Sequence, residues 1–107
     1  MGKRKRAGSQ ERDPFEPLAG VVVDSFDLHG FHATEARAAV IDFLRRAQQR
    51  TPDGLVHIIT GRGRGSPGRP VLKGVVKALL QSGAVPVRRW DEDLDGGGFL
   101  VRLGALR

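Results

Sequence analysis

The sequence contains no cysteine, and this absence excludes several kinds of chemistry at once. A disulfide scaffold, a zinc site with cysteine ligands and a cysteine nucleophile all require that residue. Long apolar runs are also missing, because no stretch approaches the ~20 apolar residues that span a bilayer. The N-terminus is basic, but no apolar segment follows it as it would in a secretory signal. We therefore expect a cytoplasmic protein that does not engage a membrane.

Positive charge is what the chain has in excess. Its 107 residues carry 18 Lys+Arg against 12 Asp+Glu, which gives a formal net charge of +6 and a pI near 11.0. This balance favours polyanionic partners, with nucleic acid first and an anionic membrane surface second. The length and the 39% of hydrophobic residues predict one domain with a single modest core.

The first residues are basic and almost free of apolar side chains. Residues 1–12 contain one acid, Glu11, and five bases: Lys3, Arg4, Lys5, Arg6 and Arg12. Such a stretch cannot bury enough surface to offset the entropy lost on ordering. We predict a disordered basic tail over residues 1–17 and a folded domain over residues 18–107. The tail is either a solubilising terminus or a phosphate-binding arm, and the sequence leaves both open.

The folded part alternates between two kinds of pattern. Residues 21–28, 55–59, 85–90 and 99–103 are apolar and rich in β-branched residues, which predicts strands. Residues 32–50 and the segment from Pro70 have helical periodicity, and Gly83 suits a helix C-cap. Pro86 places the third strand at an edge or limits its start. The order βαβαββ predicts an α/β two-layer sandwich, with a mixed sheet and two helices on one face. The continuous apolar run at 55–59 predicts burial on both faces.

Asp27-Leu28-His29-Gly30 lies at the carboxyl end of the first strand. Side chains at i and i+2 of a strand share a face, so Asp27 and His29 should project together. Ligands of open α/β sheets bind at that edge. A histidine can transfer protons near neutral pH, and a neighbouring carboxylate can fix its tautomer. Alternatively, the two side chains merely hydrogen-bond the strand-to-helix turn.

Thr60-Gly61-Arg62-Gly63-Arg64-Gly65-Ser66 follows the second strand and leads to a helix. Glycines let the backbone approach a phosphate, and successive amides can bind an anion. Neither a P-loop nor the dinucleotide fingerprint matches this spacing. The expected nucleic-acid-binding residues are Thr60, Gly61, Arg62, Gly63, Arg64, Arg69 and Lys73. If the first two strands are parallel neighbours, this loop lies beside His29. A flexible, solvated loop is the alternative.

These two motifs resemble those of the Smr (small MutS-related) domain family. Phe26-Asp27-Leu28-His29-Gly30 is similar to the family's first-strand motif, with Phe26 in place of the usual leucine. Ile59-Thr60-Gly61-Arg62-Gly63 is similar to its second motif, and Gly96-Gly97-Gly98-Phe99 to its closing Gly-rich strand. The resemblance covers about residues 20–104. It implies the fold of the C-terminal domain of translation initiation factor three, a standalone bacterial domain, and nicking or cleavage of DNA or RNA. It implies Asp27 and His29 as catalytic residues and Gly61, Arg62 and Gly63 as the binding loop.

Other polar residues have simpler interpretations. His57 lies inside an apolar strand, so we expect a structural histidine. His32 is expected to cap the first helix or lie on the surface, with a role as a second acid as the alternative. The acidic run at residues 91–95 lacks EF-hand spacing and is expected to be a solvated loop.

The leading hypothesis is a nucleic-acid-binding endonuclease. His29 would act as general base or acid, and Asp27 would orient it or help to hold a divalent cation such as Mg²⁺ or Mn²⁺. Arg62 and Arg64 would bind the scissile phosphate. One alternative is a binding module without catalysis that recognises structured DNA or RNA. A protein-interaction adaptor is a further alternative, and ribosomal RNA is a further partner for the basic tail.

Overall fold

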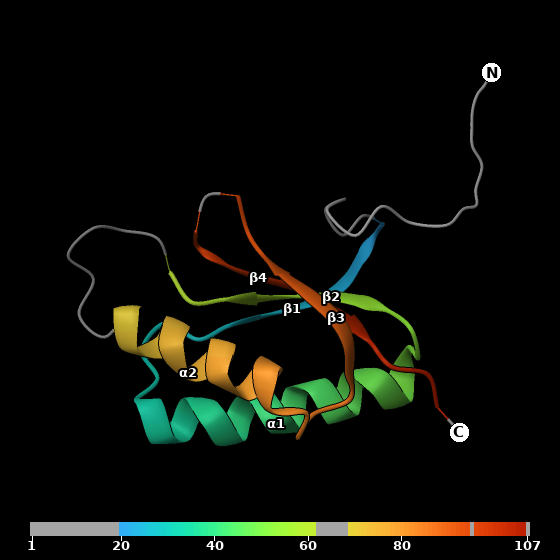
Figure 1. The fold of residues 1–107 in the computed structure, drawn as a ribbon, viewed down its shortest axis with the longest axis horizontal. Coiled ribbons are helices and arrows are strands. Elements are labelled where there is room, and N and C mark those ends of the chain that lie inside the picture. The colour runs from blue at the N-terminus through green and yellow to red at the C-terminus, as the bar shows by residue number, and fades with distance from the viewer. Residues whose placement is uncertain (1–19, 62–68, 95, 107) are drawn as a thin grey trace.

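The computed structural model describes residues 20–61, 69–94 and 96–106. Six elements follow one another along the chain (Figure 1). They are β1 (Val22–Asp27), α1 (Ala33–Arg50), β2 (Leu55–Ile59), α2 (Arg69–Ser82), β3 (Val87–Glu92) and β4 (Gly98–Leu103). The predicted order βαβαββ is confirmed.

The four strands form one mixed sheet in the order β1-β2-β4-β3. β1 and β2 are parallel, as the α1 crossover between them requires, whereas β4 runs antiparallel to both β2 and β3. Both helices lie on the same side of the sheet (Figure 1). The two-layer α/β sandwich with its helices on one face is therefore confirmed.

The core lies between the helices and the facing side of the sheet. Val56 and Ile58 of β2 are fully buried there, with Phe99, Val101 and Leu103 of β4. The helices contribute the residues at helical spacing: Ala36, Val40, Leu44 and Ala47 from α1 and Leu72, Val76, Leu79 and Leu80 from α2. On the helix-free side of β2, Leu55 is buried but His57 and Ile59 are half-buried. Burial on both faces, which the apolar run predicted, is therefore only partly present, because the helices cover one face.

The third strand differs from its prediction at both ends. It begins at Val87, directly after Pro86, and it is an edge strand, as the proline indicated. It continues to Glu92 instead of ending at Trp90, because Asp91 and Glu92 pair with Leu100 and Phe99 of β4. The first two acids of the predicted loop therefore belong to the sheet.

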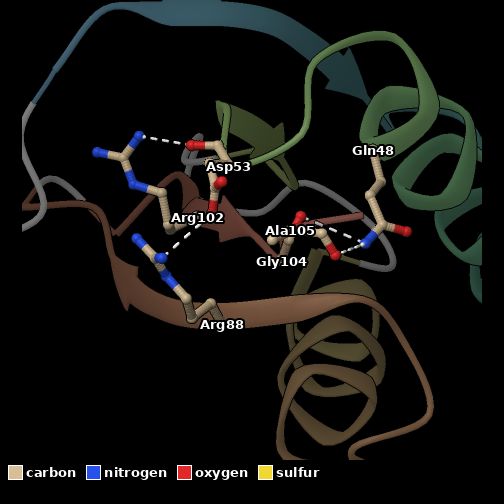
Figure 2. Close-up of polar contacts among 6 residues, drawn as sticks. All are labelled: Gln48, Asp53, Arg88, Arg102, Gly104 and Ala105. Carbon is tan, nitrogen blue, oxygen red and sulfur yellow. Dashed lines mark hydrogen bonds and ion pairs between the residues drawn. The ribbon is translucent and has the colours of Figure 1, made fainter. Parts of the chain in front are cut away.

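The end of the sheet where β1 and β2 begin is closed by polar contacts (Figure 2). Asp53, in the turn before β2, has a φ of 64°. Its carboxylate accepts a bond from Arg88 at 3.1 Å, and its carbonyl accepts one from Arg102 at 3.0 Å. The Gln48 amide of α1 donates to the carbonyls of Gly104 and Ala105. These contacts fix the start of β2 and the segment after β4 against the rest of the domain.

Two expectations fall outside this description. The basic tail predicted at residues 1–17 and the loop residues 62–68 lie outside the described residues.

Within the described part, neither helix combines the length and the apolar character needed to cross a membrane.

Candidate functional site

The two sequence motifs meet at one edge of the sheet. β1 and β2 pair in parallel, with Asp27 opposite Ile59, and the Leu28 amide donates to the Ile59 carbonyl at 2.8 Å. The residues that follow each strand therefore leave the sheet side by side. β1 and β2 are therefore the parallel neighbours on which the prediction depended, and the loop predicted to lie beside His29 begins at Gly61 at this end of the sheet.

The segment from Asp27 to Phe31 forms a tight turn with its own hydrogen bonds. Asp27 Oδ1 accepts the His29 amide at 3.0 Å, and the Phe31 amide donates to the Leu28 carbonyl at 3.0 Å. Gly30 has a φ of 88°, as the third position of a type II turn requires, and side chains other than glycine rarely adopt it. The turn role that the sequence left open for Asp27 is therefore present.

Asp27 and His29 are both exposed, and they flank Leu28, which is fully buried. Leu28 thus anchors the turn in the core while its neighbours face solvent. Within the described part of the chain, the His29 imidazole has no hydrogen-bond partner, and Asp27 contacts the His29 amide, not the ring. An imidazole held in this way is open to an exogenous hydroxyl, water or phosphate.

Contacts between aromatic rings hold the turn against the helix α1. The ring of Phe26 lies 5.7 Å from that of Phe31, edge to face, and 5.1 Å from that of Phe43 in α1. Such pairs add roughly 0.5–1.5 kcal/mol beyond the burial of their area. Phe26, the departure from the leucine of the similar family, therefore ties the turn to α1.

Thr60 and Gly97 join the second motif to the Gly-rich segment before β4. The Gly97 carbonyl accepts bonds from the Thr60 amide at 2.9 Å, the Gly61 amide at 3.1 Å and the Thr60 hydroxyl at 3.4 Å. Thr60 is only 2% exposed, so its side chain supports the site from within. Gly61 has a φ of 101°, which turns the chain away from β2 into the arginine loop.

The predicted cationic residues are distributed unevenly around this edge. Arg62, Gly63 and Arg64 lie outside the described residues. Arg69 is the first residue of α2, and the Lys73 amine on the same helix forms an ion pair with Glu92. Part of the charge of Lys73 is therefore used inside the protein.

The remaining histidines have structural partners. His32 is the N-cap of α1, where its amide donates to Glu35 at 3.1 Å and its carbonyl accepts the Ala36 amide, which confirms the capping interpretation. His57 Nε2 lies 2.6 Å from Asp93 Oδ2, which confirms a structural histidine.

Asp93, the third acid of the predicted solvated loop, also differs from that prediction. Its side chain is only 16% exposed and is bonded to His57, so it does not belong to a solvated loop. The sequence indicated only that a histidine in an apolar strand needs a polar partner, and it did not indicate which residue that partner is.

No group of three His, Cys, Asp or Glu side chains is close enough to hold a metal ion within the described ranges. At this edge, Asp27 supplies a single carboxylate, with one oxygen already on the His29 amide.

Comparison with known proteins identifies a matching family. The family model of the Smr domain matches residues 26–99, a range that includes both motifs and the Gly-rich segment. Neither the curated proteins nor the solved structures contain a significant match.

Proposed function

The chain belongs to the Smr domain family, which is known for nucleic-acid binding and nicking activity, and we propose that it is an endonuclease cleaving phosphodiester bonds of DNA or RNA. The observation that carries the proposal is the pairing of β1 with β2, which brings Asp27 and His29 to the start of the arginine loop. This arrangement supports a division of roles in which His29 transfers protons and the loop that begins at Gly61 binds the phosphate.

His29 performs the proton transfer in this proposal. On RNA, its imidazole takes the proton of the 2′-hydroxyl, whose oxygen attacks the adjacent phosphorus; the bond from phosphorus to the 5′-oxygen breaks, and that oxygen leaves with a proton from solvent water. On DNA, the imidazole takes the proton of a water that attacks the phosphorus; one phosphorus–oxygen ester bond breaks, and the leaving sugar oxygen takes a proton from solvent water. A positioned acid or base of this kind contributes about 10²–10⁴-fold to the rate.

The loop residues bind the phosphate that is cleaved. Arg62 and Arg64 carry the charge that balances the phosphorane, and the glycines bring backbone amides within reach of its oxygens. Asp27 holds the His29 backbone through the turn, and its negative charge favours the imidazolium formed during the reaction.

This end of the sheet provides only part of the ligand set of a divalent cation. Mg²⁺ is commonly bound by one or two carboxylates together with substrate phosphates, and Asp27 offers one carboxylate. Such an ion, when bound, would stabilise charge on the phosphate.

The test is cleavage of supercoiled plasmid and of a structured RNA, each with EDTA, Mg²⁺ or Mn²⁺. We expect His29→Ala to lose at least about 100-fold in cleavage rate while keeping its affinity for the nucleic acid. His32→Asn is the matched control, because asparagine also serves as an N-cap. Cleavage that is equal in His29→Ala and the parent would contradict the proposal.

A binding module without catalysis is the second candidate. It is favoured by the Asp27 hydrogen bond to the His29 amide, which gives the Asp-x-His pattern a purely structural use. Affinity for nucleic acid without cleavage under any of these conditions would establish it.

A further inference from the structure

Positive charge is concentrated in the helix layer. α1 carries four arginines against two acids, and α2 carries one arginine and two lysines with no acid. The four strands together carry three arginines against four acids. The helix layer therefore has a net positive charge, and the sheet has a slightly negative one.

Three of these cations have no ionic or hydrogen-bonding partner among the described residues. Arg37 and Arg45 of α1 and Lys77 of α2 are exposed, and none has an ion pair or side-chain hydrogen bond within the described residues. By contrast, Arg46 is paired with Asp42 and Arg50 with Asp24. The three unpaired groups are available to an external anion.

A pocket of about 500 Å³ lies at the far end of this surface. Its lining comes from α1 and from the segment after α2: Arg45, Arg46, Gln48, Gln49, Ala84 and Pro86. The Gln48 side chain is held by the carbonyls of Gly104 and Ala105 (Figure 2), so this part of the wall is fixed. Arg46 and Gln48 already donate to other groups, so the donors left for a ligand are the Arg45 guanidinium and the Gln49 amide. No carboxylate lines the pocket, which suits a phosphate group.

The pocket is separated from the His29 edge by most of the length of α1. Both helices begin at the end of the sheet where β1 and β2 finish and run in the same direction (Figure 1). Arg45 lies thirteen residues after the N-cap His32, which at 1.5 Å per residue is about 20 Å. Because each strand of a duplex advances about 3.4 Å per step, this distance equals about six base pairs.

We propose that Arg37, Arg45, Lys77 and the adjoining pocket form a second docking surface, for the phosphate backbone of a double-helical nucleic acid. This inference rests on the proposed function, since it places the scissile bond of the same molecule at His29. A rigid duplex reaches from one site to the other, so the substrate extends about six base pairs beyond the cleaved bond.

The experiment compares two hairpins that share a loop and have stems of about 5 and about 15 base pairs. Affinity is measured by fluorescence anisotropy across a salt series for the parent, the triple variant Arg37→Gln/Arg45→Gln/Lys77→Gln, and Arg88→Gln. Arg88 is the control because it is an exposed arginine of the sheet that is already paired with Asp53. Circular dichroism checks that each variant is folded.

We expect the triple variant to bind the long hairpin at least about tenfold more weakly, with a salt slope that is shallower by about 2–3. Its affinity for the short hairpin should change little, and Arg88→Gln should bind both hairpins like the parent. An unchanged slope on the long hairpin, or an equal loss on both hairpins, would overturn the docking surface.

The outcomes separate this inference from the proposed function. If the triple variant binds the long hairpin like the parent while His29→Ala stops cleavage, only the docking surface is wrong. If the long hairpin binds through the helices but no substrate is cleaved, the nuclease is wrong and the surface belongs to a binding module.

Discussion

Asp27 has two separable properties, its hydrogen-bonding oxygen and its negative charge. The oxygen holds the His29 amide at 3.0 Å and so fixes the turn that presents the imidazole. The negative charge is the second property, and in the proposed reaction it would balance the imidazolium that forms at His29. A substitution that removes one property and keeps the other can therefore assign the role of this residue.

Asp27→Asn is that substitution, because the asparagine oxygen accepts the same amide bond without the charge. We expect its thermal stability to stay close to that of the parent while its cleavage rate falls by about 10–100-fold. Asp27→Ala should in addition lose about 0.5–1.5 kcal/mol of stability, because the turn loses its hydrogen bond. Full cleavage by the asparagine variant would restrict Asp27 to the turn.

At this scale, the sequence predicted the residues whose placement depends on local rules. The N-cap role of His32 follows from its position before a helical pattern. Strand alternation does not describe Asp27 and His29, because β1 ends at Asp27 and His29 lies in the turn that follows. The His57–Asp93 bond could not be predicted, because it joins residues 36 positions apart across β2, β4 and β3. Its formation depends on the strand order, which alternation along one strand does not encode.

Among the elements, β4 is the one with the strictest steric requirement. A Cβ atom added to Gly98 would lie 2.2 Å from the Ile58 carbonyl oxygen, which is part of the backbone of β2 and cannot move aside. Gly98 is therefore needed for the close pairing of β4 with β2, beside the site held by Gly97. Gly74 in the helix α2 has no such requirement, because nothing lies within 4 Å of a Cβ added there.

We expect Gly98→Ala to destabilise the protein by about 3 kcal/mol, at the upper end of the cost of overpacking. For a domain of this size, the melting temperature should fall by more than about 10 °C. Gly74→Ala is the matched control and should stabilise the protein by about 0.5–1 kcal/mol, because alanine favours a helix interior. Thermal unfolding followed by circular dichroism measures both, and equal shifts would contradict this account of β4.

Most of the helices and strands were predictable from the sequence, and the main exception is the end of β3. The amphipathic helices and the strand β2 follow from hydrophobic periodicity, with Gly83 ending α2 as expected, at a φ of 79°. The end of β3 was placed too early because Asp91 and Glu92 are poor strand formers. Pairing with β4 and the ion pair between Glu92 and Lys73 outweigh that local preference.

At the scale of the whole molecule, every residue of the core cluster in the described part of the chain lies between Leu28 and Leu103. Residues 1–17 contain five Lys or Arg and three acids, so removing them lowers the formal charge and leaves all of these core residues in place. Binding and folding can therefore be separated by truncation at this point.

We expect a protein lacking residues 1–17 to unfold within a few degrees of the full chain and to bind the long hairpin with a shallower dependence on salt. The reason is that each phosphate contact contributes about 0.9 to the slope of log affinity against log salt. Full-length protein with Lys3, Arg4, Lys5 and Arg6 changed to glutamine is the control, since it loses the charge and keeps the segment. An unchanged slope in both would make the tail a solubilising terminus, which was the other interpretation of its composition. A large fall in melting temperature for the truncated protein alone would instead mean that the tail packs on the domain, where Val21 is 82% exposed and Val22 and Val23 are 41% and 46% exposed.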